Sequence, residues 1–261
     1  QNPPSICGSL NLVGTTFSED FENLGVAWTN DATGPSEGYD PARKQWRLTN
    51  EDLPHERAGT VFFAPTPPDE DCDHEVPQNG VATLETAEIP ISISNDGPTI
   101  LSFDHYIETQ LLPLQFGNEL LDGGNLSYQN YDEGTGEWGD WDLVPPESFV
   151  FNGYTSVIMN SLEYQGQTYT NDNPLSGQPA FGGSNTNDLD SVWGTTHLDL
   201  STLATGSKIR VRFNLGTIGV LSCGSRGGWY LDNFEVVRCQ SICGDGVVTS
   251  GEQCDDGNGS D

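Results

Sequence analysis

Acidic side chains lie in two segments far apart in the chain, where together they could bind a metal ion. Glu19, Asp20 and Glu22 belong to the opening segment FSEDFE, and Asp232 belongs to the late segment GGWYLDNFEV. Side-chain alternation along a strand would place Asp232 among apolar residues, where a carboxylate needs a partner. Since the first and last strands of a sandwich are often neighbours, these carboxylates would repel one another unless a cation such as Ca²⁺ bound between them. A salt bridge to arginine or lysine, or hydrogen bonds to loop backbone, would also satisfy Asp232.

A second group of oxygen ligands lies near the end of the chain. Asp255, Asp256 and Asn258 surround a glycine in the segment DDGN. Oxygen ligands alternating around glycine are typical of Ca²⁺ loops, although the EF-hand spacing is absent. The segment therefore predicts a second Ca²⁺ site, and the alternative is a solvated acidic turn closed by a disulfide.

Two tryptophans in the segment EWGDWD could bind sugar. Trp138 and Trp141 are each flanked by carboxylates. An aromatic face can stack against a sugar ring while neighbouring carboxylates accept hydrogen bonds from its hydroxyls. The alternative is that both indoles cap the hydrophobic core.

The motifs of several enzyme classes are missing. His55-Glu56 and His74-Glu75 lack the second histidine of a zinc peptidase helix, and no nucleophile elbow of the form GxSxG occurs. Carboxylate pairs for glycoside hydrolysis are always available among 39 acidic residues, so they carry no information. We therefore expect a protein without catalytic activity.

The charge of the chain restricts its partners. Nine Lys and Arg residues against 39 Asp and Glu residues give a formal net charge of −30. A field of this sign repels nucleic acid and anionic lipid and attracts cations. No apolar run approaches the roughly 18 residues of a membrane span, so we expect no membrane insertion.

Six cysteines, an even number, favour an oxidising compartment outside the cell. Cys7 and Cys239 bracket most of the chain, and domain termini are often close together, so a bond between them is plausible. The remaining pairs would then be Cys243–Cys254 and Cys72–Cys223, although six cysteines allow fifteen connectivities. Zinc is the alternative, but no histidine lies near the last three cysteines.

The elements that must position these residues are predicted to be β-strands. Strand-like runs separated by turn signals are Thr60–Ala64, Val81–Glu85, Thr99–Ile107, Asn125–Gln129, Ser156–Met159, Thr195–Leu198, Lys208–Leu215 and Trp229–Val237. In Lys208–Leu215 apolar and polar residues alternate strictly, which indicates a half-buried strand. Its basic residues are expected to pair with nearby carboxylates, and the alternative is an anion-binding strip. Long irregular stretches are expected at 29–52, 65–78 and 169–192. The pattern predicts an all-β, antiparallel two-sheet sandwich of jelly-roll type.

The end of the chain resembles a known repeat. Residues 243–258, CGDGVVTSGEQCDDGN, resemble the Cys-rich repeat of secreted and surface proteins of myxobacteria and related bacteria. That repeat continues with further cysteines, so we expect this chain to be a piece of a longer protein. The predicted domains are a jelly roll at 1–238 and the beginning of a disulfide-rich repeat at 239–261.

The larger segment carries a second resemblance, over Thr16–Val237. FSEDFE followed by Trp28, then LSFDHY, DGGNLSY, NPLSGQPAF and GGWYLDNFEV, are similar in order to motifs of MAM-type and related jelly-roll modules. The nearest variants are accessory domains of bacterial secreted metallopeptidases and of cleaved adhesins. The resemblance implies a structural Ca²⁺ site on Asp20, Glu22 and Asp232 that joins the two ends of the domain.

Together these features predict a non-catalytic, Ca²⁺-stabilised adhesion or recognition module, secreted or on the cell surface. Its partner would be a glycan or protein of a cell surface or matrix. Two alternatives remain open: a self-associating subunit of an extracellular fibre or sheath, and an accessory domain of a secreted metallopeptidase.

Overall fold

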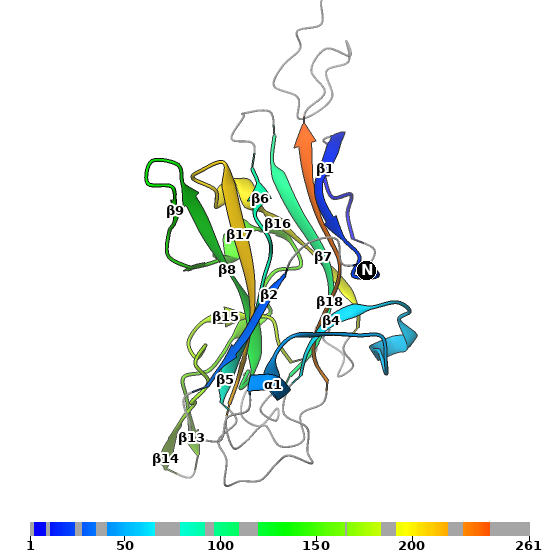
Figure 1. Cartoon of the computed structure of the whole chain (residues 1–261). Coiled ribbons are helices and arrows are strands. Elements are labelled where there is room, and N and C mark those ends of the chain that lie inside the picture. Colours follow the sequence, from blue (N-terminus) through cyan, green and yellow to red (C-terminus); the bar gives the residue numbers. More distant parts are fainter. Residues whose placement is uncertain are drawn as a thin grey trace, which may run out of the picture.

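The computed structural model describes residues 3–8, 11–23, 28–34, 41–65, 79–91, 97–109, 120–164, 166–183, 192–218 and 227–240. Over these residues the chain forms an antiparallel two-sheet sandwich, which confirms the predicted fold class (Figure 1). Within the described residues there are three short stretches of 3-10 helix, Pro54–Glu56, Pro146–Ser148 and Leu200–Thr202, and one short α-helix, α1, Pro41–Lys44.

The first sheet has the order β11-β16-β7-β18-β4-β3, and β1 also pairs with β18. Its strands are β1 (Asn11–Glu19), β3 (Arg47–Thr49), β4 (Val61–Pro65), β7 (Thr99–Glu108), β11 (Phe149–Phe151), β16 (Gly194–Asp199) and β18 (Gly228–Gln240). β4 lies beside the first half of β18 and β1 beside the second half, while β7 lies along the other side. The predicted neighbourhood of the opening and closing strands is therefore confirmed.

The second sheet has the order β10-β8-β17-β5-β2. Its strands are β2 (Thr29–Thr33), β5 (Gly80–Glu85), β6 (Ile89–Pro90), β8 (Gly123–Asp132), β9 (Glu137–Trp138), β10 (Asp142–Leu143) and β17 (Lys208–Thr217), with β6 paired to β17 and β9 to β8. Two further small antiparallel pairs belong to neither sheet: β12 (Ser156–Val157) with β15 (Pro179–Ala180), and β13 (Ser161–Tyr164) with β14 (Gln167–Thr170).

The expectation of irregular structure at 29–52 is wrong in part, because this stretch contains β2, α1 and β3. β2 is an edge strand with one buried residue, Ala32, so its sequence TNDAT shows no apolar alternation. The stretch at 169–192 likewise includes β15, whereas 66–78 lies outside the described residues.

The core lies between the two sheets. The apolar residues of β17 alternate as predicted, with Ile209, Val211, Phe213 and Leu215 all buried. From the opposite sheet Trp229 approaches the backbone of β8 so closely that a Cβ at Gly124 would lie 2.2 Å from its ring. Glycine at position 124 thus allows the largest side chain of the closing strand to fill the centre of the sandwich.

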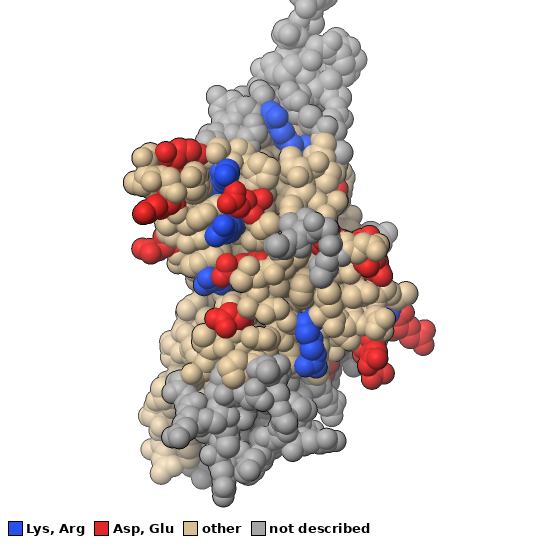
Figure 2. Space-filling view, viewed as in Figure 1, with Lys and Arg blue, Asp and Glu red and all other residues tan. Residues whose placement is uncertain are grey.

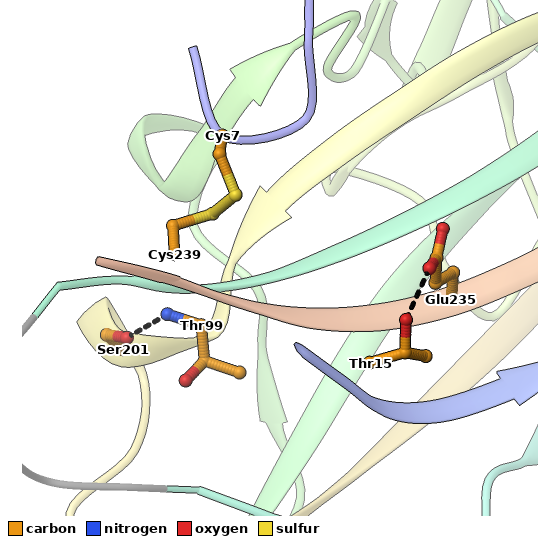
Figure 3. Close-up of a disulfide and its surroundings, with 6 residues drawn as sticks. All are labelled: Cys7, Thr15, Thr99, Ser201, Glu235 and Cys239. Atoms are coloured by element: carbon orange, nitrogen blue, oxygen red, sulfur yellow. Dashed lines mark hydrogen bonds between the residues drawn. A yellow bond between two sulfur atoms is a disulfide. The ribbon is translucent and has the colours of Figure 1, made fainter. Parts of the chain in front are cut away.

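A disulfide joins the segment before β1 to the end of β18, as predicted. Cys7 and Cys239 are bonded, with their Cα atoms 5.4 Å apart and a separation of 232 positions in the sequence (Figure 3). Both are buried beside Ile100 and Val237. Such a bond restricts the unfolded chain, and its loss from a small secreted domain typically costs about 2–5 kcal/mol. Because β18 continues through Gln240, Cys239 belongs to the sandwich rather than to a following segment.

The other two predicted pairs, Cys72–Cys223 and Cys243–Cys254, lie outside the described residues. Over the part of the chain that the structure describes, no helix is both long and apolar enough to cross a membrane.

Candidate functional site

The polar face of β17 carries three of the nine basic residues of the chain, and each contacts a carboxylate as predicted. Lys208 Nζ lies 2.9 Å from Glu88 Oε2, and Arg210 lies 3.5 Å from the other oxygen of Glu88. Arg212 contacts Glu85 Oε1 at 2.5 Å. The hydrogen bond from Lys208 lowers the pKa of Glu88 and correspondingly raises the pKa of Lys208.

Each of these cations also lies over an aromatic ring. The Lys208 ammonium is 5.0 Å from the centroid of Tyr131, the Arg210 guanidinium is 4.1 Å from Trp138, and the Arg212 guanidinium is 3.8 Å from Trp141. All three rings are partly exposed. We call these three pairs, together with Glu85 and Glu88, the β17 strip.

The strip lies on the outer face of the second sheet. The two tryptophans therefore do not cap the core, because their contacts are with side chains that point away from it. In Figure 2 basic side chains alternate with acidic ones along this part of the surface.

Strands β8, β9 and β10 hold the rings in place. Tyr131 pairs with Trp138 across a tight hairpin, and their rings meet edge to face with centroids 5.3 Å apart. Asp132 Oδ1 accepts the backbone N–H of Gly134 at 2.7 Å and thereby closes the turn. β10 follows directly on Trp141 and pairs again with β8. The β8–β9 hairpin and the start of β10 thus place the two indoles over the outward side chains of β17.

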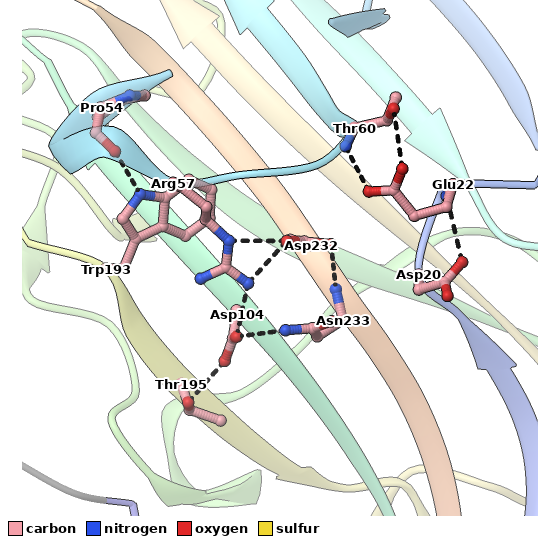
Figure 4. A network of polar contacts seen from close by, with 10 residues as sticks. All are labelled: Asp20, Glu22, Pro54, Arg57, Thr60, Asp104, Trp193, Thr195, Asp232 and Asn233. Atoms are coloured by element: carbon pink, nitrogen blue, oxygen red, sulfur yellow. Dashed lines mark hydrogen bonds and ion pairs between the residues drawn. The ribbon is translucent and has the colours of Figure 1, made fainter. Parts of the chain in front are cut away.

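Arg57 lies where the sequence predicts a Ca²⁺ ion. Its guanidinium contacts Asp232 Oδ2 at 2.7 Å and Asp104 Oδ2 at 2.9 Å, and it lies 4.1 Å from the ring centroid of Trp193 (Figure 4). Asp104 also accepts hydrogen bonds from Asn233 Nδ2 and Thr195 Oγ1. We call Arg57, Asp104 and Asp232 the Arg57 clamp; it joins β7 and β18 to the loop before β4.

The two carboxylates of the clamp differ in their pKa. Burial raises the pKa of Asp104, but hydrogen bonds from Thr195, Asn233 and Arg57 outweigh it, so the net shift is downward. For Asp232 burial dominates over Arg57, and the pKa is raised. Asp232 is thus the carboxylate that most needs the guanidinium.

The other two predicted ligands lie apart from Asp232. Asp20 and Glu22 follow the end of β1; Asp20 Oδ1 accepts the Glu22 N–H at 3.1 Å, and Glu22 Oε1 accepts the Thr60 N–H at 2.6 Å. Figure 4 shows this pair and the Arg57 clamp as separate groups.

Of the described residues, no three or more His, Cys, Asp or Glu are arranged to hold a metal ion. As arranged, Asp232 does not fit a Ca²⁺ site together with Asp20 and Glu22, because a guanidinium already lies against it. Ca²⁺ binding by these residues stays a prediction, and Asp255, Asp256 and Asn258 lie outside the described residues.

Sequence reasoning missed Arg57 and Asp104. The strand period places Asp104 on the outer face of β7, which was a usable signal. Arg57 gave none, because it lies in a loop 175 positions from Asp232.

His105 is a core residue, fully buried between the sheets. Thr196 Oγ1 donates to the carbonyl of Asn152 at 2.7 Å and lies 3.1 Å from His105 Nε2, while Trp229 Nε1 donates to His105 Nδ1 at 3.3 Å. These partners assign the proton of a neutral ring to Nε2. Burial lowers the pKa of His105 to about 4.

Comparison with known proteins shows little beyond the end of the chain. Residues 221–261 match a family described as a domain of unknown function (DUF4215), and of these only 227–240 are described. No curated protein matches the chain.

Two solved structures are weakly similar to this chain. The enzymatically active domain of tailspike protein 4 of bacteriophage CBA120 has 14% identity over 85% of this chain, with a TM-score of 0.38. The arabinosyltransferase EmbB of Mycobacterium smegmatis has 14% identity over 92%, with a TM-score of 0.26. The chain spans about a fifth of each protein, 21% in both cases, and neither likeness carries an argument about function.

Proposed function

We propose that this chain is a non-catalytic recognition module that acts outside the cell and binds a glycan on the β17 strip. The observation that carries the proposal is the arrangement of Trp138 and Trp141, each held against an arginine and each still partly exposed. The Cys7–Cys239 disulfide supports the extracellular location, since such bonds persist in oxidising compartments.

The rings of the strip are organised before any ligand arrives. A stacked guanidinium and a hydrogen-bonded hairpin already restrict both indoles, so little side-chain freedom is lost on binding. Tryptophan offers a large apolar surface to the ring of a sugar. The ion pairs beside the indoles present both donors and acceptors, which suits hydroxyl groups that both donate and accept.

Affinity electrophoresis in gels containing soluble cellulose derivatives, xylan, mannan or polygalacturonate tests the proposal. We expect one or more polysaccharides to slow the wild-type protein, and we expect Trp141→Ala to lose at least about tenfold in affinity, as for an aromatic residue at the centre of an interface. Tyr169→Ala is the matched control, because Tyr169 on β14 is an exposed aromatic residue (46%) away from the strip.

Circular dichroism of each variant checks that it is folded. Migration unchanged by every polysaccharide, or slowed equally in wild type and Trp141→Ala, would contradict the proposal. The proposal does not require Ca²⁺, so the predicted Ca²⁺ dependence is tested separately.

A further inference from the structure

We infer that the ligand of the β17 strip is an uncharged glycan chain that lies lengthwise along β17. This inference rests on the proposed function and adds the shape and charge of the ligand. It follows from the spacing of the three ring positions and from the carboxylates around them.

The three aromatic positions form a row. Lys208, Arg210 and Arg212 are successive outward residues of one strand, and each lies over its own ring. Residues two apart along a strand are about 6.6–6.8 Å apart. The cations therefore follow the strand at regular intervals, and the rings of Tyr131 and Trp138 that two of them contact meet edge to face with centroids 5.3 Å apart. A chain of several units would thus contact more than one ring of the strip, whereas a single sugar would reach one.

The charges of the strip favour a neutral ligand. Its three cations are already in contact with Glu85 and Glu88. The hairpin that carries the tryptophans adds five exposed carboxylates: Asp132, Glu133, Glu137, Asp140 and Asp142. An anionic chain would meet this acidic border, whereas the hydroxyls of a neutral chain can use the paired cations as donors and the carboxylates as acceptors.

Isothermal titration with neutral oligosaccharides of two to six units tests the length of the ligand. The probes are the series derived from cellulose, xylan and mannan. For the series that binds, we expect affinity to rise at least about tenfold between two and four units, equivalent to one further ring contact. Tyr131→Ala, which removes the ring at one end of the row, should abolish this rise, and circular dichroism checks that the variant is folded. Tyr131→Phe keeps the ring and should retain the rise, which separates loss of the ring from loss of the hydroxyl.

Galacturonate oligosaccharides and a salt series test the charge of the ligand. We expect no binding of the acidic chains. We also expect the affinity for neutral chains to change less than about twofold between 50 and 500 mM NaCl, because a ligand without charge has no ionic attraction to the strip that salt could screen.

Three results would overturn the inference while the proposed function stands: affinity independent of chain length, preference for acidic chains, or a steep loss of affinity with salt. In each case Trp141→Ala would still abolish the binding. Absence of binding to every probe, or binding unaffected by Trp141→Ala, would overturn both.

Discussion

Replacing Arg57 with methionine should destabilise the protein substantially at neutral pH. The substitution keeps an unbranched apolar stem but leaves Asp104 and Asp232 facing each other on neighbouring strands without the guanidinium. Breaking a fully buried ion pair costs about 3–5 kcal/mol, whereas an exposed pair contributes about 1 kcal/mol or less. The side chains of Arg57, Asp104 and Asp232 are 19%, 22% and 9% exposed. We therefore expect a loss of about 2 kcal/mol, which lowers the melting temperature by about 4–8 °C.

The effect should depend on pH in a defined direction. Without the guanidinium the pKa values of both carboxylates rise. The loss of stability caused by Arg57→Met is therefore complete at pH 7, and it shrinks towards pH 4 as one carboxylate binds a proton. In the wild-type protein the lowered pKa of Asp104 stabilises the fold above the ordinary value of 3.8, and this contribution disappears as the pH falls through the folded value.

Thermal and urea unfolding of four proteins measures the effect: wild type, Arg57→Met, Asp232→Asn and the double variant. The double variant should recover part of the lost stability, because it removes one of the two unpaired carboxylates and their mutual repulsion. Lys208→Met is the matched control, since its pair with Glu88 is 41% and 45% exposed and should contribute far less to stability than the Arg57 clamp.

Each unfolding experiment is repeated in Ca²⁺ and in EDTA. An Arg57→Met variant within about 0.5 kcal/mol of wild type would refute the reasoning. So would a wild-type protein that loses stability in EDTA while Arg57→Met changes nothing, because the positive charge beside Asp232 would then come from a metal ion.

Two further predictions concern the core. The pKa of His105 is lowered from 6.5 to about 4, so the free energy of unfolding should be unaffected by this group above pH 6.5 and should fall by about 3 kcal/mol as the pH falls towards 4. Urea unfolding at several pH values should show that stability depends less on pH in His105→Gln than in wild type. The same pH dependence in both proteins would exclude this role. Gly124→Ala places a Cβ 2.2 Å from the ring of Trp229, so it should lower the free energy of unfolding by about 1–3 kcal/mol or prevent folding. Gly166→Ala is the control: its Cβ meets nothing within 4 Å, so it should be destabilised only by the strain of its positive φ, which is the smaller effect. Equal melting temperatures for the two variants would contradict the close approach of Trp229 to Gly124.

Periodicity predicted the long central strands because they are half-buried. The alternation of Lys208–Leu215 identifies both a strand and its buried face, and the structure confirms both. The short strands β9 and β10 were not predicted, because two residues cannot show a period. The edge strand β2 was missed because it has almost no buried residue.

The candidate site was predicted in part. The sequence identified Trp138 and Trp141 but left open whether they lie in the core or on the surface, since an indole suits both places. It also predicted that the basic residues of β17 pair with carboxylates, without saying which. For Arg212 the register of β17 against β5 decides which carboxylate it contacts, because Arg212 lies opposite Glu85 and both side chains point to the same face of the sheet.

The long strands and their buried faces, the large excess of negative charge and the proximity of Cys7 to Cys239 all follow from the amino-acid sequence, because they depend on local periodicity, composition and the closeness of domain ends. The pairing of Asp232 with Arg57 and the contact of three aromatic rings with the cations of β17 became visible only in the folded chain. Both depend on contacts between side chains from distant segments, and a local sequence pattern does not indicate which distant residue a side chain will contact.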